Sequence, residues 1–129
     1  MTGCIDVIEA ARRILAARRR RERSLPVDLL GEPAWDILLD LLVSEAEGRE
    51  VPLKSACIAS RVPATTAMRC LEGLRHRGFV EHRADPGDRR RKLLALTSMG
   101  NAAIRAAILD SLPLTFGPVE VRASTSEAA

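Results

Sequence analysis

Apolar residues recur at helical spacing in several segments of this chain, and prolines and glycines separate those segments. The segment from Ile5 to Arg23 contains neither glycine nor proline, which predicts a first helix. Residues 25–33 contain two prolines and one glycine, which predicts a connector. Pro33 suits the first turn of a second helix, because its missing N–H costs nothing there. That helix is predicted to end at Gly48 and to bury one apolar stripe: Trp35, Leu38, Leu39, Leu42, Val43 and Ala46.

The middle of the chain predicts two helices separated by a tight break. Residues 51–53 are predicted to be extended, and a third helix follows from Lys54 or Ser55 to Ser60. Residues 61–63 form the break because they end in proline. A fourth helix is predicted from Ala64 to Arg77 with Gly78 as its stop signal, and its inward face is Ala67, Cys70, Leu71 and Leu74.

A β-hairpin and a final helix are predicted next. The expected strands are residues 79–83 and 92–96, and the turn between them is residues 85–88. Thr97 is the expected N-cap of the last helix, and Pro113 is expected to end it.

This order of elements is that of a winged helix-turn-helix. We therefore expect a mainly α fold with a small β-hairpin wing (α+β), to which an N-terminal dimerisation helix is added. A chain of 129 residues leaves room for one hydrophobic core. The expected divisions are an N-terminal helix at residues 1–24, a connector at 25–33, a winged helix-turn-helix domain at 34–112 and a disordered tail at 113–129.

Charged residues are sorted along the chain in a way that the net charge of +3 conceals. Residues 12–23 carry seven arginines against Glu22, whereas residues 28–50 hold seven acids and only Arg49. Residues 61–92 hold nine cations against four acids, and such a basic cluster indicates a polyanionic partner. One Trp, two Phe and no Tyr argue against single strands and RNA, because those are bound by stacking on aromatic side chains. Double-stranded DNA is the favoured partner.

The start of the fourth helix carries the expected base-reading residues, which lie off its apolar face: Thr65, Thr66, Met68 and Arg69. Arg69 can donate two hydrogen bonds to a guanine edge, the threonines can bond phosphate or base, and Met68 offers apolar contact. The alternative is that Thr65 only caps the helix and that Arg69 is a solvated charge.

The predicted hairpin turn leads into four successive cations, Arg89 to Lys92. A phosphate backbone or a narrow minor groove would neutralise their mutual repulsion. Asp88 is expected to pair with Arg90 and orient it, which leaves Arg89 and Arg91 on the other face of the ribbon. The alternative is a solvated run of charges.

The wing sequence from Asp85 to Gly100 resembles the MarR family of winged-helix regulators, whose pattern is D-x-x-D-x-R, five residues, then L-T-x-x-G. The resemblance covers about residues 34–112. It implies that Arg90 enters the DNA minor groove with Asp88 as its orienting partner. It also implies that Thr65, Thr66 and Arg69 contact DNA from the recognition helix. MarR-like proteins end in long helices that build a dimer and a ligand cleft, so a last helix ended by Pro113 argues against a small-molecule effector.

The first helix is expected to replace the missing C-terminal part as a dimerisation element, its apolar side pairing with the last helix of a partner. This predicts a homodimer on a roughly palindromic site. Arg18 to Arg21 could instead contact DNA or an acidic protein. The alternative function is a winged-helix module that binds a protein, using Arg18 to Arg21 and the acidic second helix as docking surfaces.

Enzymatic motifs are missing from the sequence. His76 and His82 have no carboxylate or cysteine at suitable spacing, and the odd set of Cys4, Cys57 and Cys70 contains no C-x-x-C pair. We therefore expect no catalysis, no cofactor and no metal, with Cys57 and Cys70 in the core and Cys4 exposed. We also expect no membrane segment and a cytoplasmic location.

Overall fold

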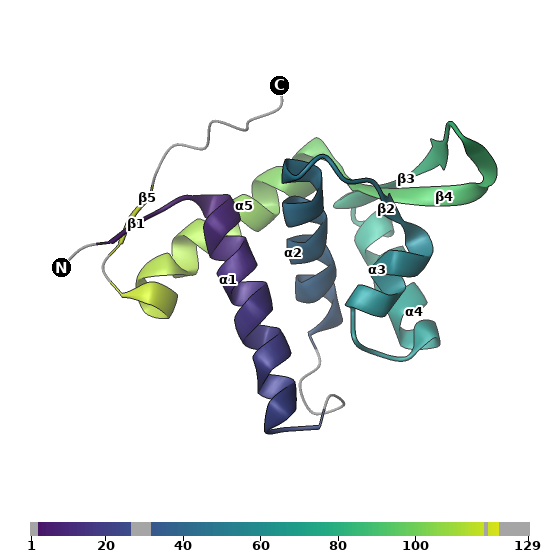
Figure 1. Ribbon diagram of the computed structural model, residues 1–129. Helices are drawn as coiled ribbons and strands as arrows, with labels where there is room; N and C mark the ends of the chain where they lie inside the picture. Colours follow the sequence, from purple (N-terminus) through teal and green to yellow (C-terminus); the bar gives the residue numbers. More distant parts are fainter. Residues whose placement is uncertain (1–2, 27–31, 118, 122–129) are drawn as a thin grey trace.

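The computed structural model describes residues 3–26, 32–117 and 119–121 (Figure 1). The elements confirm the predicted α+β winged helix. In chain order they are β1 (Gly3–Ile5), α1 (Val7–Arg20), the 3-10 helix η1 (Arg21–Arg23), α2 (Pro33–Ala46), β2 (Val51–Pro52), α3 (Leu53–Ala59), α4 (Ala64–His76), β3 (Val80–Asp85), β4 (Asp88–Leu96), α5 (Ser98–Phe116) and β5 (Val119–Val121).

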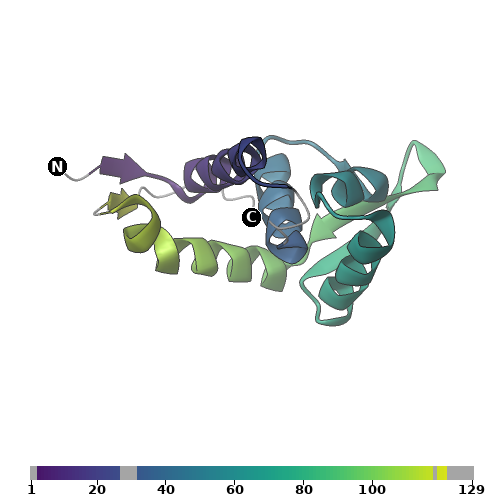
Figure 2. The same cartoon turned by 90° about the horizontal axis from the view of Figure 1, so that it is seen from below.

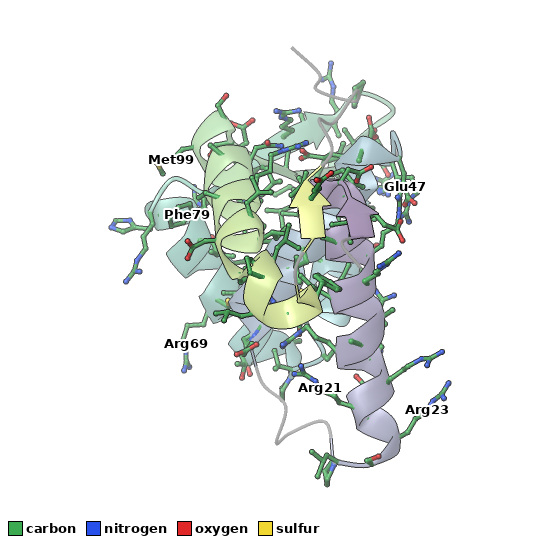
Figure 3. The ribbon with its side chains drawn as sticks, turned by 90° about the vertical axis from the view of Figure 1, so that its left-hand side faces the viewer. Arg21, Arg23, Glu47, Arg69, Phe79 and Met99 are labelled. Atoms are coloured by element: carbon green, nitrogen blue, oxygen red, sulfur yellow. The ribbon has the colours of Figure 1, made fainter. Side chains whose placement is uncertain are left out.

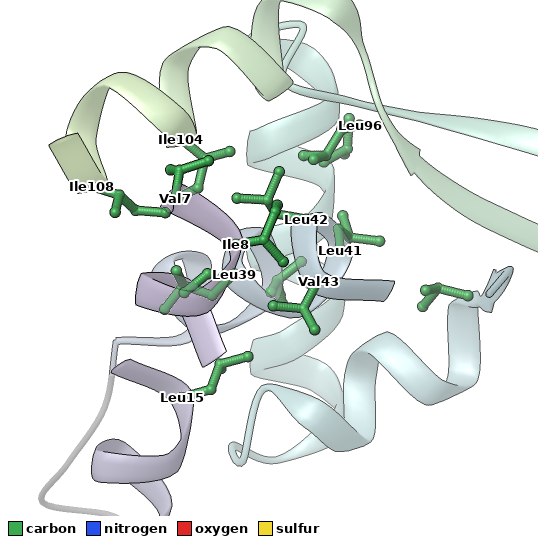
Figure 4. Close-up of a cluster of buried hydrophobic side chains, with 14 of the residues drawn as sticks. Val7, Ile8, Leu15, Leu39, Leu41, Leu42, Val43, Leu96, Ile104 and Ile108 are labelled. Carbon is green, nitrogen blue, oxygen red and sulfur yellow. The ribbon is translucent and has the colours of Figure 1, made fainter. Parts of the chain in front are cut away.

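Helix α2 is the centre of the core, with α1 and α5 packed on one side of it and the helix-turn-helix on the other (Figures 1 and 4). The predicted single stripe on α2 is wrong in detail. Ile37 and Leu41 are fully buried although they lie off that stripe, while Trp35 and Leu38 are only partly buried. A helix enclosed by neighbours on several sides needs apolar residues nearly all round.

Helix α1 begins at Val7, because the side chain of Asp6 accepts a hydrogen bond from the Glu9 N–H at 2.8 Å and caps the helix. Ile5 therefore belongs to β1 and not to the helix predicted from it. The apolar side of α1, which includes Ile8 and Leu15, is buried against α2 and α5 of the same chain. This side is consequently not free for the predicted pairing with a partner's last helix.

The wing is a three-stranded antiparallel sheet in the order β2-β4-β3. The predicted second strand is too short, because β4 already begins at Asp88 and includes the whole run of cations. Lys92 lies opposite Ala84, and the register then shifts so that Asp85 lies opposite Asp88, which leaves Arg89, Arg90 and Arg91 in a bulge of β4. The hairpin extends well beyond the helices (Figure 2). The three arginines therefore lie on an irregular part of β4 next to the turn, and of the four cations only Lys92 is paired in register with β3.

The junction between the wing and α5 explains the L-T-x-x-G part of the motif. Thr97 caps α5 by accepting the Gly100 N–H at 2.9 Å, and its hydroxyl donates to the Gly78 carbonyl at 2.5 Å. A Cβ on Gly100 would lie 1.8 Å from the carbonyl oxygen of Phe79. Only glycine fits where the start of α5 meets the strand, so this contact fixes the wing to the body.

Helix α5 corrects the expected end of the chain's folded part. Pro113 lies inside the helix, which continues to Phe116 and ends at Gly117 with a φ of 72°. Proline removes its own N–H from the helix, and Pro113 lies on the exposed side of α5, near the C-terminal end of the helix. Residues 119–121 then pair with β1 in parallel, so the predicted disorder from residue 113 onward is wrong for residues 113–117 and 119–121.

Most of the predicted connector and residues 122–129 lie outside the described residues, and the division into domains stays a prediction.

Candidate nucleic-acid interface

Helix α4 exposes all four residues predicted to read bases: Thr65, Thr66, Met68 and Arg69. Its opposite face is held in the core by the buried Ala67, Leu71 and Leu74. Arg69 points away from the body of the molecule (Figure 3). The N-cap is Pro63, with no side-chain capping bond, so Thr65 is not the cap of this helix and its hydroxyl is free of that role.

The wing exposes Arg89, Arg90 and Arg91, and the side chain of Arg90 is 97% exposed. Asp88 accepts the backbone N–H of Arg90 at 3.0 Å, whereas the distance from its carboxylate to Arg90 Nε is 3.9 Å. Asp88 therefore holds the backbone of Arg90 more firmly than its guanidinium. The guanidinium remains available to an external acceptor.

Asp85 is a further wing residue that was absent from the predicted contacts, although it opens the motif. One of its oxygens accepts the Gly87 N–H at 2.9 Å, and the other lies 3.6 Å from Arg91 Nη1. The carboxylate thus shapes the turn and restrains Arg91 at the same time.

A groove of about 400 Å³ lies between α3, α4 and the wing. Met68 from α4 and Arg90 and Arg91 from β4 line it together, whereas Thr65, Thr66 and Arg69 are not among its lining residues. Lys54 and Lys92 complete its cationic rim, and Leu53 and Cys57 contribute to its apolar part. No acid is among its lining residues: Pro52, Leu53, Lys54, Cys57, Met68, Arg90, Arg91 and Lys92.

Lys54 is a candidate contact that the sequence did not reveal. It lies beside the wing because β2, which directly precedes α3, pairs with β4 through Val51 opposite Leu94 and Pro52 opposite Leu93. Only this long-range pairing places Lys54 near the arginines. A basic residue directly after a short extended segment was the one local sign.

Arg18 does not belong to the exposed basic surface, which corrects its assignment to a docking segment. Its side chain is only 10% exposed and forms ion pairs with Asp36 and Glu32. Burial acts to lower the pKa of Arg18, but the hydrogen bond and charge of Asp36, together with Glu32, raise it above its ordinary value. Arg19, Arg20 and Arg21 remain exposed.

The acidic second helix is likewise used inside the molecule. Asp36 is buried against Arg18, and the Glu45 carboxylate accepts the backbone N–H of Leu96 at 2.9 Å. These contacts remove two of the acids that a protein-docking surface on α2 would need. The protein-binding alternative is therefore not favoured.

The described residues hold no group of three or more His, Cys, Asp or Glu side chains arranged for a metal ion. Cys57 and Cys70 were predicted to be core residues, but both are only half-buried. Burial raises the pKa of the Cys70 thiol. The Cys4 side chain lies outside the described part. Within that same part, no helix is long and apolar enough to cross a membrane.

The fold is similar to that of several solved structures. No protein-family model matches the chain, and no curated protein matches its sequence. Among solved structures, MepR from S. aureus in a DNA-binding conformation is 18% identical over 78% of this chain and 70% of its own, with a TM-score of 0.54. A MarR mutant from E. coli complexed with operator DNA is 23% identical over 64% of this chain and 55% of its own, with a TM-score of 0.51.

A protein from Archaeoglobus fulgidus is 18% identical over 71% of this chain and 98% of its own, with a TM-score of 0.54. The alignment with the MarR mutant, by contrast, spans little more than half of the MarR chain. At these identities the likeness concerns the fold. It confirms the resemblance drawn from the wing motif: the chain has the winged helix-turn-helix fold of MarR and MepR.

Proposed function

We propose that this protein is a transcriptional regulator that binds double-stranded DNA with α4 in the major groove and the wing in the minor groove. The observation that carries the proposal is the groove shared by Met68 of α4 and Arg90 of the wing, with a rim of four cations and no acid. The DNA complex of MarR and the DNA-binding conformation of MepR, which share the fold, support it.

The residues divide by the part of DNA that each would meet. Arg69, Thr65 and Thr66 project from the first turns of α4, where an inserted helix reaches base edges. Arg90, almost fully exposed at the wing, suits a narrow minor groove, whose negative potential attracts arginine. Lys54 and Lys92 flank the groove and suit backbone phosphates.

A homodimer is part of the proposal, with α5 and not α1 as the contact between protomers. The face of α5 opposite its buried Ile104, Ile108 and Leu112 is exposed and apolar. Spacings of three and four residues, which bring side chains onto one helix face, define a stripe: Met99, Ala102, Ala106, Leu109 and Pro113. A second copy of α5 would cover it, and a two-fold dimer would present two recognition helices to a palindromic site.

The last helix is not cut short at Pro113, the feature that spoke against a small-molecule effector, because α5 continues past that residue to Phe116. Regulation by a ligand is therefore neither required nor opposed by the length of this helix.

Selection of bound sequences from a random duplex pool tests the proposal directly. We expect a recurring, roughly palindromic site whose half-sites lie about one helical turn apart. Binding of the selected duplex should weaken steeply with salt, since phosphate neutralisation releases counterions. A pool that shows no enrichment, together with no duplex binding at low salt, would refute DNA binding.

A further inference from the structure

The turn that joins α3 to α4 contains an unusual backbone conformation at Arg61. Its φ is 63°, and it is the only non-glycine residue with a positive φ in the described part of the chain. Side chains disfavour this left-handed region, where glycine or asparagine is the usual choice. An arginine at such a position needs a compensating interaction.

The Arg61 guanidinium supplies that interaction by binding Glu22 of η1 with two hydrogen bonds. Arg61 Nε donates to Glu22 Oε1 at 2.6 Å, and Nη2 donates to Oε2. Two parallel bonds between guanidinium and carboxylate fix orientation as well as distance. The Glu22 side chain is only 19% exposed, so solvent screens this pair less than a fully exposed one.

Glu22 lies next to a helix that is firmly packed in the fold. It follows α1 directly, and α1 is anchored to α2 by the buried Leu15 and by the ion pair of Arg18 with Asp36. The Arg61–Glu22 pair therefore connects the helix-turn-helix turn to the N-terminal helix, across 39 positions of sequence.

The first turn of the helix that follows has no side-chain cap and no buried side chain. Pro63 at the N-cap makes no side-chain capping bond, and the next residue with a buried side chain is Ala67. The buried Ala67, Leu71 and Leu74 hold the later part of α4, and the turn precedes the end at which Thr65 and Thr66 lie.

We infer that the Glu22–Arg61 ion pair positions the recognition helix, and that Glu22 is a positioning residue for DNA binding. This inference rests on the proposed function. It assigns a task to the N-terminal segment that requires no contact between that segment and DNA, namely holding the turn so that α4 presents its first residues in a fixed direction.

Charge and positioning predict opposite effects of a Glu22 substitution on DNA affinity. Glu22 is the one acid among seven arginines at residues 12–23, so its neutralisation increases the local positive charge. By charge alone, Glu22→Gln would strengthen DNA binding. If the ion pair positions α4, the same substitution weakens it.

The test compares Glu22→Gln with Glu9→Gln on the duplex selected with the wild-type protein. Glu9 lies in α1, the helix that directly precedes η1, its carboxylate pairs with Arg12 and Arg13, and the substitution makes the same change of charge. We expect Glu22→Gln to raise Kd about fivefold, in the range of measured coupling between contacting groups. The slope of log Kd against log salt should not change, because no phosphate contact is lost. Glu9→Gln should bind as tightly as the wild type or slightly more tightly.

Amide hydrogen exchange of the free proteins supplies a readout that does not depend on DNA. The amides of Ala67 and Met68, the first in α4 with a backbone acceptor, should exchange faster in Glu22→Gln than in the wild type or Glu9→Gln, while α5 exchanges at the same rate in all three. Equal or tighter DNA binding by Glu22→Gln, or unchanged exchange at the start of α4, would overturn the inference. A wild-type protein that binds no duplex would instead refute the proposed function, and the exchange data would still decide whether the pair holds the turn.

Discussion

Asp88 accepts the backbone N–H of Arg90 at 3.0 Å, while the Arg90 guanidinium stays 97% exposed and at the limit of ion pairing with the same carboxylate. The acid of the wing motif thus acts first on the backbone. It shapes the strand that carries the arginine and leaves the charge free for a partner. Removal of charge and removal of the hydrogen-bond acceptor therefore have different consequences at position 88.

Asp88→Asn should keep DNA affinity, because the amide oxygen still accepts the Arg90 N–H and one negative charge disappears from the interface. Asp88→Ala should bind more weakly, since the loss of a turn hydrogen bond costs about 1 kcal/mol. Fluorescence anisotropy on one labelled duplex measures both. If the two variants lose affinity equally, the role of Asp88 is electrostatic and not the one described above.

Arg90→Ala and Arg69→Ala should differ in what they lose. Arg90→Ala should weaken binding to all duplexes and lower the salt slope by about 1, as expected for one lost DNA contact. Arg69→Ala should cost about 1–3 kcal/mol on the selected site and much less on an unrelated duplex. Titrations of both duplexes at several salt concentrations separate the two roles. Arg83→Ala, on the wing strand but paired with Glu81, is the control for a change of charge alone.

Gly100→Ala should destabilise the fold by roughly 2–4 kcal/mol, since its Cβ would overlap the Phe79 carbonyl and backbone must move. Gly73→Ala is the matched control, because a Cβ there meets nothing within 4 Å on the exposed side of α4. That second change should stabilise the protein by about 0.5–1 kcal/mol. Urea denaturation measures both, and similar effects of the two substitutions would contradict the close contact.

Asp40→Asn should stabilise the protein at pH 7. Burial raises the pKa of Asp40 above its ordinary value, against the opposing effect of Arg19 and Arg49. A carboxyl with a raised pKa in the folded state binds its proton more tightly there, so ionisation at neutral pH opposes folding. The advantage of the variant should disappear as the pH falls below the ordinary carboxyl range. The free energy of unfolding of Asp40→Asn, measured at pH 7 and at acid pH, tests this prediction. Glu50→Gln, at an exposed position, is the control. An Asp40→Asn variant less stable than the wild type at pH 7 would refute it.

Leu109→Lys should convert a dimer into monomers, because it places a charge in the centre of the apolar stripe on α5. Ile58→Lys, which changes an exposed apolar residue of α3, should leave the oligomeric state unchanged. Light scattering after size-exclusion chromatography reports the mass. A wild-type monomer at micromolar concentration, or a Leu109→Lys dimer, would exclude α5 as the contact.

The elements themselves were largely predictable from the sequence, because their signals are local. Pro33 at the start of α2, Gly78 after α4 and the Thr97 cap of α5 each act on the backbone within a few residues. The exposed set on α4 and the charges of the wing followed from periodicity and from a motif in register. The prediction that α5 ends at Pro113 was wrong for the same reason. The rule that proline ends a helix is local, and it does not state whether the proline lies on the buried or the exposed side of the helix.

Tertiary structure alone decided which charges are available and which are used internally. Arg18 and Arg19 are neighbours in one basic run, yet Arg18 is buried against Asp36 and Arg19 is exposed, because only one of the two sides of α1 faces α2. Lys54 joins the groove through strand pairing, and Arg61 meets Glu22 from 39 residues away. Helical and strand periods determine which residues share a face, whereas the partner of each face depends on how the elements pack, and that is settled only when the chain has folded.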